Sequence, residues 1–102
     1  MSTDNQIEQI KENLRGVYDP EISVNIFDLG LIYNISIDDT THCKILMSLT
    51  SAFCPSADEI VDDTRVAALS VNGITDCKVE ITFDPQWGPD MMSDDAKFEL
   101  GL

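Results

Sequence analysis

Thr50-Ser51-Ala52-Phe53-Cys54-Pro55-Ser56-Ala57-Asp58-Glu59 is the stretch that decides how this chain folds. Ser56 and Glu59 have the spacing of a capping box, in which two side chains satisfy free amides at the first turn of a helix. Pro55 disfavours helical backbone at the residue before it. The stretch therefore predicts the end of a strand, a tight loop that holds Cys54, and the start of a helix.

The start of that helix is a favourable place for a negative charge. Its free backbone N–H groups and the positive end of the helix dipole stabilise an anion, including a thiolate. Asp58 and Glu59 in the first turn, together with the acidity of the whole chain, act in the opposite direction. We expect Cys54 to be a reactive or ligating cysteine, while the balance between these two effects stays open.

Composition limits the classes of protein to which the chain can belong. Its 102 residues are 43% hydrophobic, which predicts a single domain over residues 1–102 with one core. No run approaches the ~18 apolar residues of a membrane span, and the polar amino terminus predicts no signal peptide and a cytoplasmic location. The formal net charge of −13 argues against nucleic acid and against anionic membrane surfaces as partners. Such acidity favours either simple solubility or a partner with a basic face.

The pattern of apolar residues predicts the secondary structure. Strands are expected where apolar and polar residues alternate, and helices where apolar residues recur every three or four positions. Asp4 and Gly16 are the expected ends of the first helix, Asn72-Gly73 ends the second, and Ser93 caps the third. The expected helices span 4–16, 57–71 and 94–100, and the expected strands span 31–38, 43–49 and 75–83. The order αββαβα, with each strand apolar on one face, predicts an α+β fold: a small three-stranded mixed sheet with helices on one face.

Chain geometry predicts which loops meet. A seven-step strand covers roughly 23 Å, and a helix of fifteen residues returns about the same length. Strand 75–83 should therefore run parallel to strand 43–49, while strand 31–38 runs antiparallel to it. One edge of the sheet should then gather Asp28, Gly30, Thr50, Ser51, Cys54, Asp84 and Trp87. The opposite edge, on the order of 20 Å away, should hold His42, Cys43 and Cys77.

Each of these residues also has a structural interpretation. Three cysteines without a Cys-x-x-Cys pair fit neither a disulfide framework nor a zinc finger, and Cys43 and Cys77 occupy core-facing positions typical of buried thiols. His42 is expected to be an exposed loop residue. Asp28 could bind the backbone amides of Leu29-Gly30 or ligate a metal, and Asp84 suits a turn. Trp87 could pack the carboxyl-terminal helix, cover the cysteine or anchor a partner, and packing is slightly favoured.

Four segments, in this order and spacing, resemble a known family. They are Asp19-Pro20-Glu21, Asp28-Leu29-Gly30-Leu31-Ile32-Tyr33, Leu49-Thr50-Ser51 followed by Cys54-Pro55, and Asp84-Pro85-Gln86-Trp87. On these segments the chain resembles the SufT/PaaD-like metal–sulfur cluster biosynthesis family, long catalogued as a domain of unknown function, over about residues 5–102. The run from Trp87 through Met91-Met92-Ser93 to Leu100-Gly101 is similar to the SufT-type members.

The resemblance implies a compact α+β fold and a role in iron–sulfur cluster assembly or delivery. The cargo it implies is a transient iron–sulfur cluster or iron, and the partners it implies are the assembly machinery and client apoproteins. Ala52-Phe53 depart from the family pattern, because many members have Pro-Gly before the cysteine. The family's cysteine falls on Cys54, and its other motif positions fall on Asp28, Thr50, Ser51 and Trp87.

Three functions follow as hypotheses. The first is a non-enzymatic accessory or carrier protein that uses Cys54 as a transient metal or sulfur ligand. Because a cluster usually takes four protein ligands, a homodimer or a partner protein would have to supply the others. The second is an acidic adaptor without chemistry that docks through its surface and the Trp87 loop. The third is a cysteine-dependent thiol enzyme, which usually needs an adjacent base, whereas the only histidine is expected at the other edge.

Overall fold

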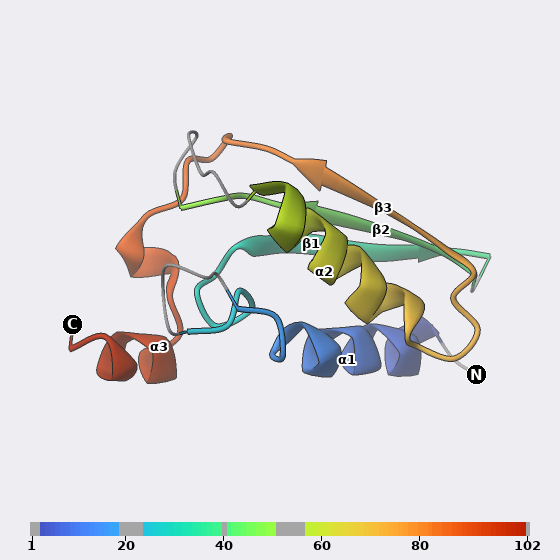
Figure 1. Ribbon diagram of the computed structural model, residues 1–102, viewed down its shortest axis with the longest axis horizontal. Coiled ribbons are helices and arrows are strands. Elements are labelled where there is room, and N and C mark those ends of the chain that lie inside the picture. Colours follow the sequence, from blue (N-terminus) through green and yellow to red (C-terminus); the bar gives the residue numbers. More distant parts are fainter. Residues whose placement is uncertain (1–2, 19–23, 40, 51–56, 102) are drawn as a thin grey trace.

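The computed structural model describes residues 3–18, 24–39, 41–50 and 57–101. Figure 1 shows a small sheet with helices beside it and the two chain ends far apart. None of the described helices is long and apolar enough to cross a membrane. In chain order the elements are α1 (Thr3–Leu14), β1 (Ile32–Asp38), β2 (His42–Met47), α2 (Ala57–Leu69), β3 (Asp76–Ile81), the 3-10 helix η1 (Pro89–Met91) and α3 (Asp94–Glu99).

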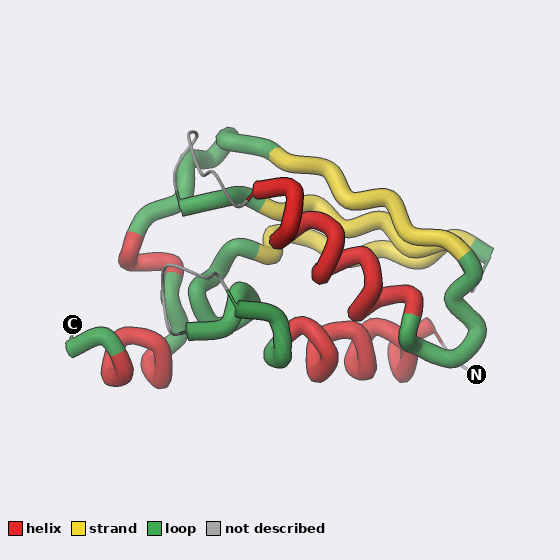
Figure 2. Tube along the Cα trace, in the orientation of Figure 1, coloured by secondary structure: helices red, strands yellow, loops and turns green. Residues whose placement is uncertain are grey.

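The sheet has the predicted topology. Its strand order is β1-β2-β3, with β1 antiparallel and β3 parallel to β2. Helix α2 makes the crossover between the two parallel strands, as such a connection requires. Figure 2 shows α1 and α2 on the same side of the sheet, and the other side carries exposed polar residues such as Ser36, Lys44 and Lys78. The α+β architecture expected from the sequence is therefore confirmed.

The core lies between the sheet and these two helices. Strand β2 directs Cys43, Ile45 and Met47 inward, and all three are buried, as the alternating pattern predicted. Helix α1 contributes Ile10 and Leu14, and α2 contributes Ile60 and Ala68. The 3.6-residue period places each helical pair on one face of its helix. The apolar residues whose spacing predicts each helix are therefore the residues that pack it against the sheet.

Two helix ends differ from the sequence-based expectation. Asp4 lies inside α1, which begins one residue earlier. Gly16 does not adopt the expected left-handed conformation, because α1 ends in tighter turns: Gly16 N–H donates to the Asn13 carbonyl at 3.0 Å and Val17 N–H to the Leu14 carbonyl at 3.1 Å. The other two ends are confirmed, since Gly73 has φ of 93° after α2 and the Ser93 hydroxyl accepts from Ala96 N–H at the start of α3.

Two strand faces also differ. A β-bulge in β1 sets Ile32 opposite Met47 and Asn34 opposite Leu46, so Tyr33 is the extra residue and leaves the core face on which alternation had placed it. The expected strand 75–83 has Ile81 and Phe83 on its inward face, but β3 already ends at Ile81. The two side chains are 36% and 42% exposed.

Candidate functional site

The predicted edge exists, and it lies where β1 begins and where β2 and β3 end. Figure 1 shows the start of α2 and the 25–30 turn at this same edge. The turn carries Asp28 and Gly30, half-buried Thr50 follows β2, and Asp84 and Trp87 follow β3. Ser51 and Cys54 lie in 51–56, outside the described residues. Their positions along the chain are bracketed by Thr50 and by Ala57, the first residue of α2.

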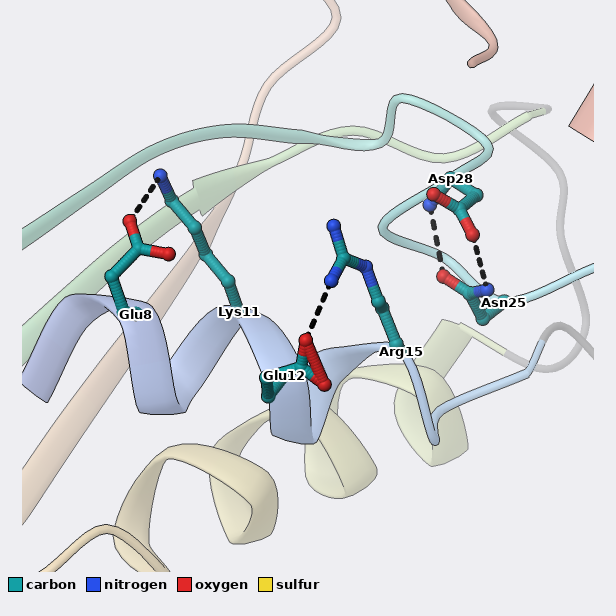
Figure 3. Close-up of polar contacts among 6 residues, drawn as sticks. All are labelled: Glu8, Lys11, Glu12, Arg15, Asn25 and Asp28. Carbon is teal, nitrogen blue, oxygen red and sulfur yellow. Dashed lines mark hydrogen bonds and ion pairs between the residues drawn. The ribbon is translucent and has the colours of Figure 1, made fainter. Parts of the chain in front are cut away.

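Asp28 is held by a neighbouring side chain. Figure 3 shows the pair: Asn25 Nδ2 donates to Asp28 Oδ2 at 2.8 Å, and Asp28 N–H donates back to Asn25 Oδ1 at 2.9 Å. The amides that Asp28 was expected to bind have other acceptors, because Leu29 N–H donates to the Asn25 carbonyl and Gly30 N–H to the Phe27 carbonyl. The carboxylate therefore stabilises the turn through Asn25. The sequence analysis missed Asn25, although its spacing of three residues from Asp28 is a local capping signal.

The turn is also attached to α1. The Arg15 guanidinium lies 5.0 Å from the centre of the Phe27 ring, a cation–π distance. Arg15 Nη1 also pairs with Glu12 Oε1 at 2.7 Å, as Figure 3 shows. Arg15, the residue that follows α1, thus links the turn to this helix through Glu12.

The segment after β3 closes over the turn. Trp87 Nε1–H donates to the Leu29 carbonyl at 2.6 Å, and Ser93 N–H donates to the Asp28 carbonyl at 2.8 Å. Gly30 has φ of 82°, and a Cβ at this position would overlap the Met91 carbonyl. The half-buried Trp87 ring packs against the core. Trp87 therefore has a packing role, while a cover over the cysteine and an anchor for a partner stay predictions.

Tyr33, displaced by the bulge, binds the same segment. Its hydroxyl donates to the Pro85 carbonyl at 2.9 Å and lies 3.6 Å from Met91 Sδ. Next to it is a mostly apolar hollow of about 490 Å³ whose lining includes Leu46, Asp84 and Pro85. Two segments that are far apart in sequence thus contact each other at the candidate edge.

A second hollow, of about 240 Å³, brings Asp28 close to α3. Its lining includes Asn25 and Asp28 from the turn and Asp95 and Glu99 from α3. These carboxylates do not form a metal-binding set. Within the described ranges, no three His, Cys, Asp or Glu side chains are placed to hold a metal ion.

The other two cysteines and the histidine lie at the opposite edge, as predicted. Cys43 and Cys77 are register partners near the starts of β2 and β3, and only 3% and 4% of their surfaces are exposed. A hydrogen bond with Cys77, and then burial, raise the pKa of the Cys43 thiol. His42, the first residue of β2, is exposed, with Nδ1 2.9 Å from the Thr41 hydroxyl. These residues fit the structural interpretation and not a role at the candidate edge.

Comparison with known proteins agrees with the motifs. The family model of iron–sulfur cluster assembly proteins matches residues 7–81. The chain is 48% identical to an Fe-S protein maturation auxiliary factor of Porphyromonas gingivalis, over 93% of this chain and 90% of the relative. It is 40% identical to the auxiliary factor SufT of Staphylococcus aureus, over 84% of this chain and 98% of the relative.

The fold is shared with solved structures. A domain of unknown function from Bacillus anthracis superposes with a TM-score of 0.90 at 36% identity, covering all of this chain and 97% of that one. The resemblance inferred from the motifs is thereby confirmed. The chain belongs to the iron–sulfur cluster assembly protein family.

Proposed function

We propose that this protein is an accessory or carrier in iron–sulfur cluster assembly or delivery, and that Cys54 is its transient metal or sulfur ligand. The cargo is a transient iron–sulfur cluster or iron, the partners are the cytoplasmic assembly machinery and client apoproteins, and no reaction is catalysed. The names of the relatives, which are maturation auxiliary factors, support this general role. The ligand assignment rests on the sequence argument for Cys54.

The observation that carries the assignment is the distribution of the three cysteines. Cys43 and Cys77 are buried near the starts of β2 and β3, whereas Cys54 follows the opposite end of β2 in the chain. Only Cys54 remains as a thiol for cargo. One thiolate cannot complete the usual four-ligand shell of a cluster, so a second copy or a partner must contribute. A shell shared in this way suits a cargo that has to be passed on.

We propose that the described site residues position this cysteine. Asp28, Thr50 and Trp87 frame the edge at which the 51–56 segment begins, and Asn25, Met91 and Ser93 hold that frame through the contacts given above. Ser51 shares the segment with Cys54, and we propose it as a further group close to the cargo.

Anaerobic reconstitution with ferrous iron and sulfide tests the proposal. The wild-type chain should gain the visible absorption of a cluster, and Cys54→Ser should lose it. Cys43→Ala and Cys77→Ala are the matched controls, since each removes one thiol and should leave loading unchanged. Equal loading of Cys54→Ser and wild type would remove the proposal.

Cys54→Ser and Trp87→Ala separate this proposal from its two alternatives, an adaptor without chemistry and a thiol enzyme. An adaptor without chemistry would retain partner binding and cellular function in Cys54→Ser and lose them in Trp87→Ala. A thiol enzyme would turn over a thiol substrate. Such an enzyme usually needs an adjacent base, and the only histidine of the sequence is His42, the first residue of β2.

A further inference from the structure

A groove runs between α1 and α2. Its wider part is a hollow of about 600 Å³ between the end of α1 and the middle of α2, and a second hollow of about 370 Å³ adjoins it. Asn13 and Ser70 line both hollows. Figure 1 shows the two helices close together where α2 ends and diverging towards the start of α2. The groove is about three helical turns long, since its lining extends from Glu8 in α1 to Tyr18 beyond the end of that helix.

A hydrogen bond fixes the spacing of the two helices within the groove. Asn13 Nδ2 donates to the Ala67 carbonyl at 3.0 Å, and both residues line the wider hollow. The adjacent residues Leu14 and Ala68 are buried in the core, so the same turns of both helices are also attached to the core. The walls of the groove are therefore formed in the free protein, and binding in it would lose little free energy to the ordering of the site.

Two exposed apolar side chains line the wider hollow. Val66 is 60% exposed and Tyr18 is 54% exposed. Val66 lies outside the buried stripe of α2, which consists of Ile60, Thr64 and Ala68. A β-branched residue at an exposed helical position lowers the helix propensity and also leaves apolar surface in water. Its exposure is therefore unfavourable for the isolated chain and would become favourable if a partner covered it.

The charged residues that line the groove are all acidic. They are Glu8, Glu12 and Asp63, and within the described ranges no lysine or arginine belongs to the lining. Glu8 pairs with Lys11 and Glu12 with Arg15, as Figure 3 shows. These pairs are exposed and therefore weak. Asp63 forms no ion pair with any residue that the structure describes.

The acidic character continues along α2. Asp58, Glu59 and Asp62 are further exposed acids of this helix. Arg65 is its single basic residue, and the Arg65 Nε donates to the Cys77 carbonyl at 3.2 Å, which holds this guanidinium at the sheet. The groove therefore combines exposed apolar side chains with an acidic rim.

We propose that this groove is a docking site for a basic amphipathic helix of a partner protein. The apolar face of the partner helix would cover Val66 and Tyr18, and its lysine or arginine side chains would lie over the acidic rim. A second copy of this chain does not fit, because each of its described α-helices carries more acidic than basic residues and like charges across an interface repel each other. The proposal goes beyond the proposed function and does not depend on the assignment of Cys54.

A nuclear magnetic resonance titration of the full chain with a synthetic peptide tests the docking site. The probe is a helical peptide of about twelve residues, blocked at both ends, with leucines at the spacing of one helical face and lysines elsewhere. We expect a Kd of about 100 μM or tighter, with the largest amide shifts at the residues that line the groove. A shuffled peptide of the same composition lacks an apolar face and should bind about tenfold more weakly or not at all.

Val66→Asp separates apolar docking from simple charge attraction. The variant makes the groove more negative but removes an apolar anchor, so the peptide should bind about tenfold more weakly. Attraction by charge alone would instead strengthen binding. Phe98→Asp is the matched control, because it makes the same kind of change at an exposed position of α3 and should not weaken binding.

Asp63→Lys tests the acidic rim. It should weaken binding about fivefold, because it replaces an attractive charge by a repulsive one. Asp38→Lys makes the same change in net charge at an exposed residue of β1 and should change the Kd by less than about twofold.

Four outcomes would overturn the proposal: no binding at about 1 mM peptide, the largest shifts outside the groove, equal binding of the shuffled peptide, or tighter binding to Val66→Asp. Reconstitution of Val66→Asp with iron and sulfide should give the cluster loading of the wild type. A failure of docking is therefore distinguishable from a failure of the cargo assignment, which Cys54→Ser tests.

Discussion

Cys43 and Cys77 lie opposite each other on the parallel strands β2 and β3, and both are buried. Their hydrogen bond and burial raise the pKa of Cys43, so its reactive thiolate form is suppressed. The two sulfurs therefore belong to the core, and they are shielded from reagents as long as the sheet is folded.

Thiol labelling should reflect this relationship. In the native protein, an aromatic disulfide reagent should modify Cys54 quickly and the other two cysteines only as the chain unfolds. The measurement is the number of thiols released with time, with and without denaturant. Cys54→Ser should abolish the fast phase. A fast phase that persists in this variant would mean that the sheet opens under native conditions.

Trp87 should contribute to stability mainly by fastening the last segment to the turn. Trp87→Phe keeps an aromatic ring but loses the hydrogen bond to the Leu29 carbonyl, which should cost about 1 kcal/mol of unfolding free energy. Trp87→Ala should cost about 2–4 kcal/mol, since it also removes packing. Urea unfolding measures both. Phe98→Ala is the control, because Phe98 is 86% exposed and should change stability by less than about 0.5 kcal/mol.

Gly30 should be the least replaceable glycine among those in the described ranges. Gly30→Ala combines an unfavourable positive φ with a clash against the Met91 carbonyl, and should cost more than about 3 kcal/mol or prevent folding. Gly101 also has positive φ, 76°, but a Cβ there meets nothing within 4 Å. Gly101→Ala should therefore cost about 1 kcal/mol or less. Thermal or urea unfolding of the two variants separates the clash from the backbone preference.

Asn25 and Asp28 should behave as one unit. Asn25→Ala removes both contacts, whereas Asp28→Ala removes only the bond to Oδ2, because the Asp28 N–H is a backbone group. Each variant should cost about 1–2 kcal/mol. The double variant should cost less than the sum of the two, with a coupling of about 1 kcal/mol in a double-mutant cycle. Additive losses would show that the two side chains stabilise the turn independently.

The spacing of apolar residues was sufficient to predict the core residues of those helices and strands that have one face covered. In β2, alternation alone identifies Cys43, Ile45 and Met47 as core residues, because each is packed under the helices. The crossover geometry of α2 then fixes β3 as parallel to β2. The same arguments place Thr50, Asp84 and Trp87 at one edge of the sheet.

The features that the sequence analysis misplaced or missed have both local and long-range causes. The bulge in β1 adds one residue and shifts the phase of the alternation, which misplaced Tyr33. Alternation also predicted that the third strand continues to Phe83, whereas β3 ends at Ile81, and it does not say whether anything covers these side chains. The docking of Met91 and Ser93 on the 28–30 turn joins segments about sixty residues apart, and no local pattern encodes such a contact. Asn25 could have been found, since Asn and Asp three residues apart often share hydrogen bonds.

The one-sided placement of the helices gives the molecule a directional electric field. The three α-helices together carry ten acidic and three basic residues. On the uncovered side of the sheet, Lys44 and Lys78 both contact Glu80, so two positive charges surround one negative charge there. A positively charged protein approaching through water would therefore be steered to the helical side first. The association rate of such a protein should fall steeply with added salt. Contacts on the sheet side would not depend on this long-range attraction.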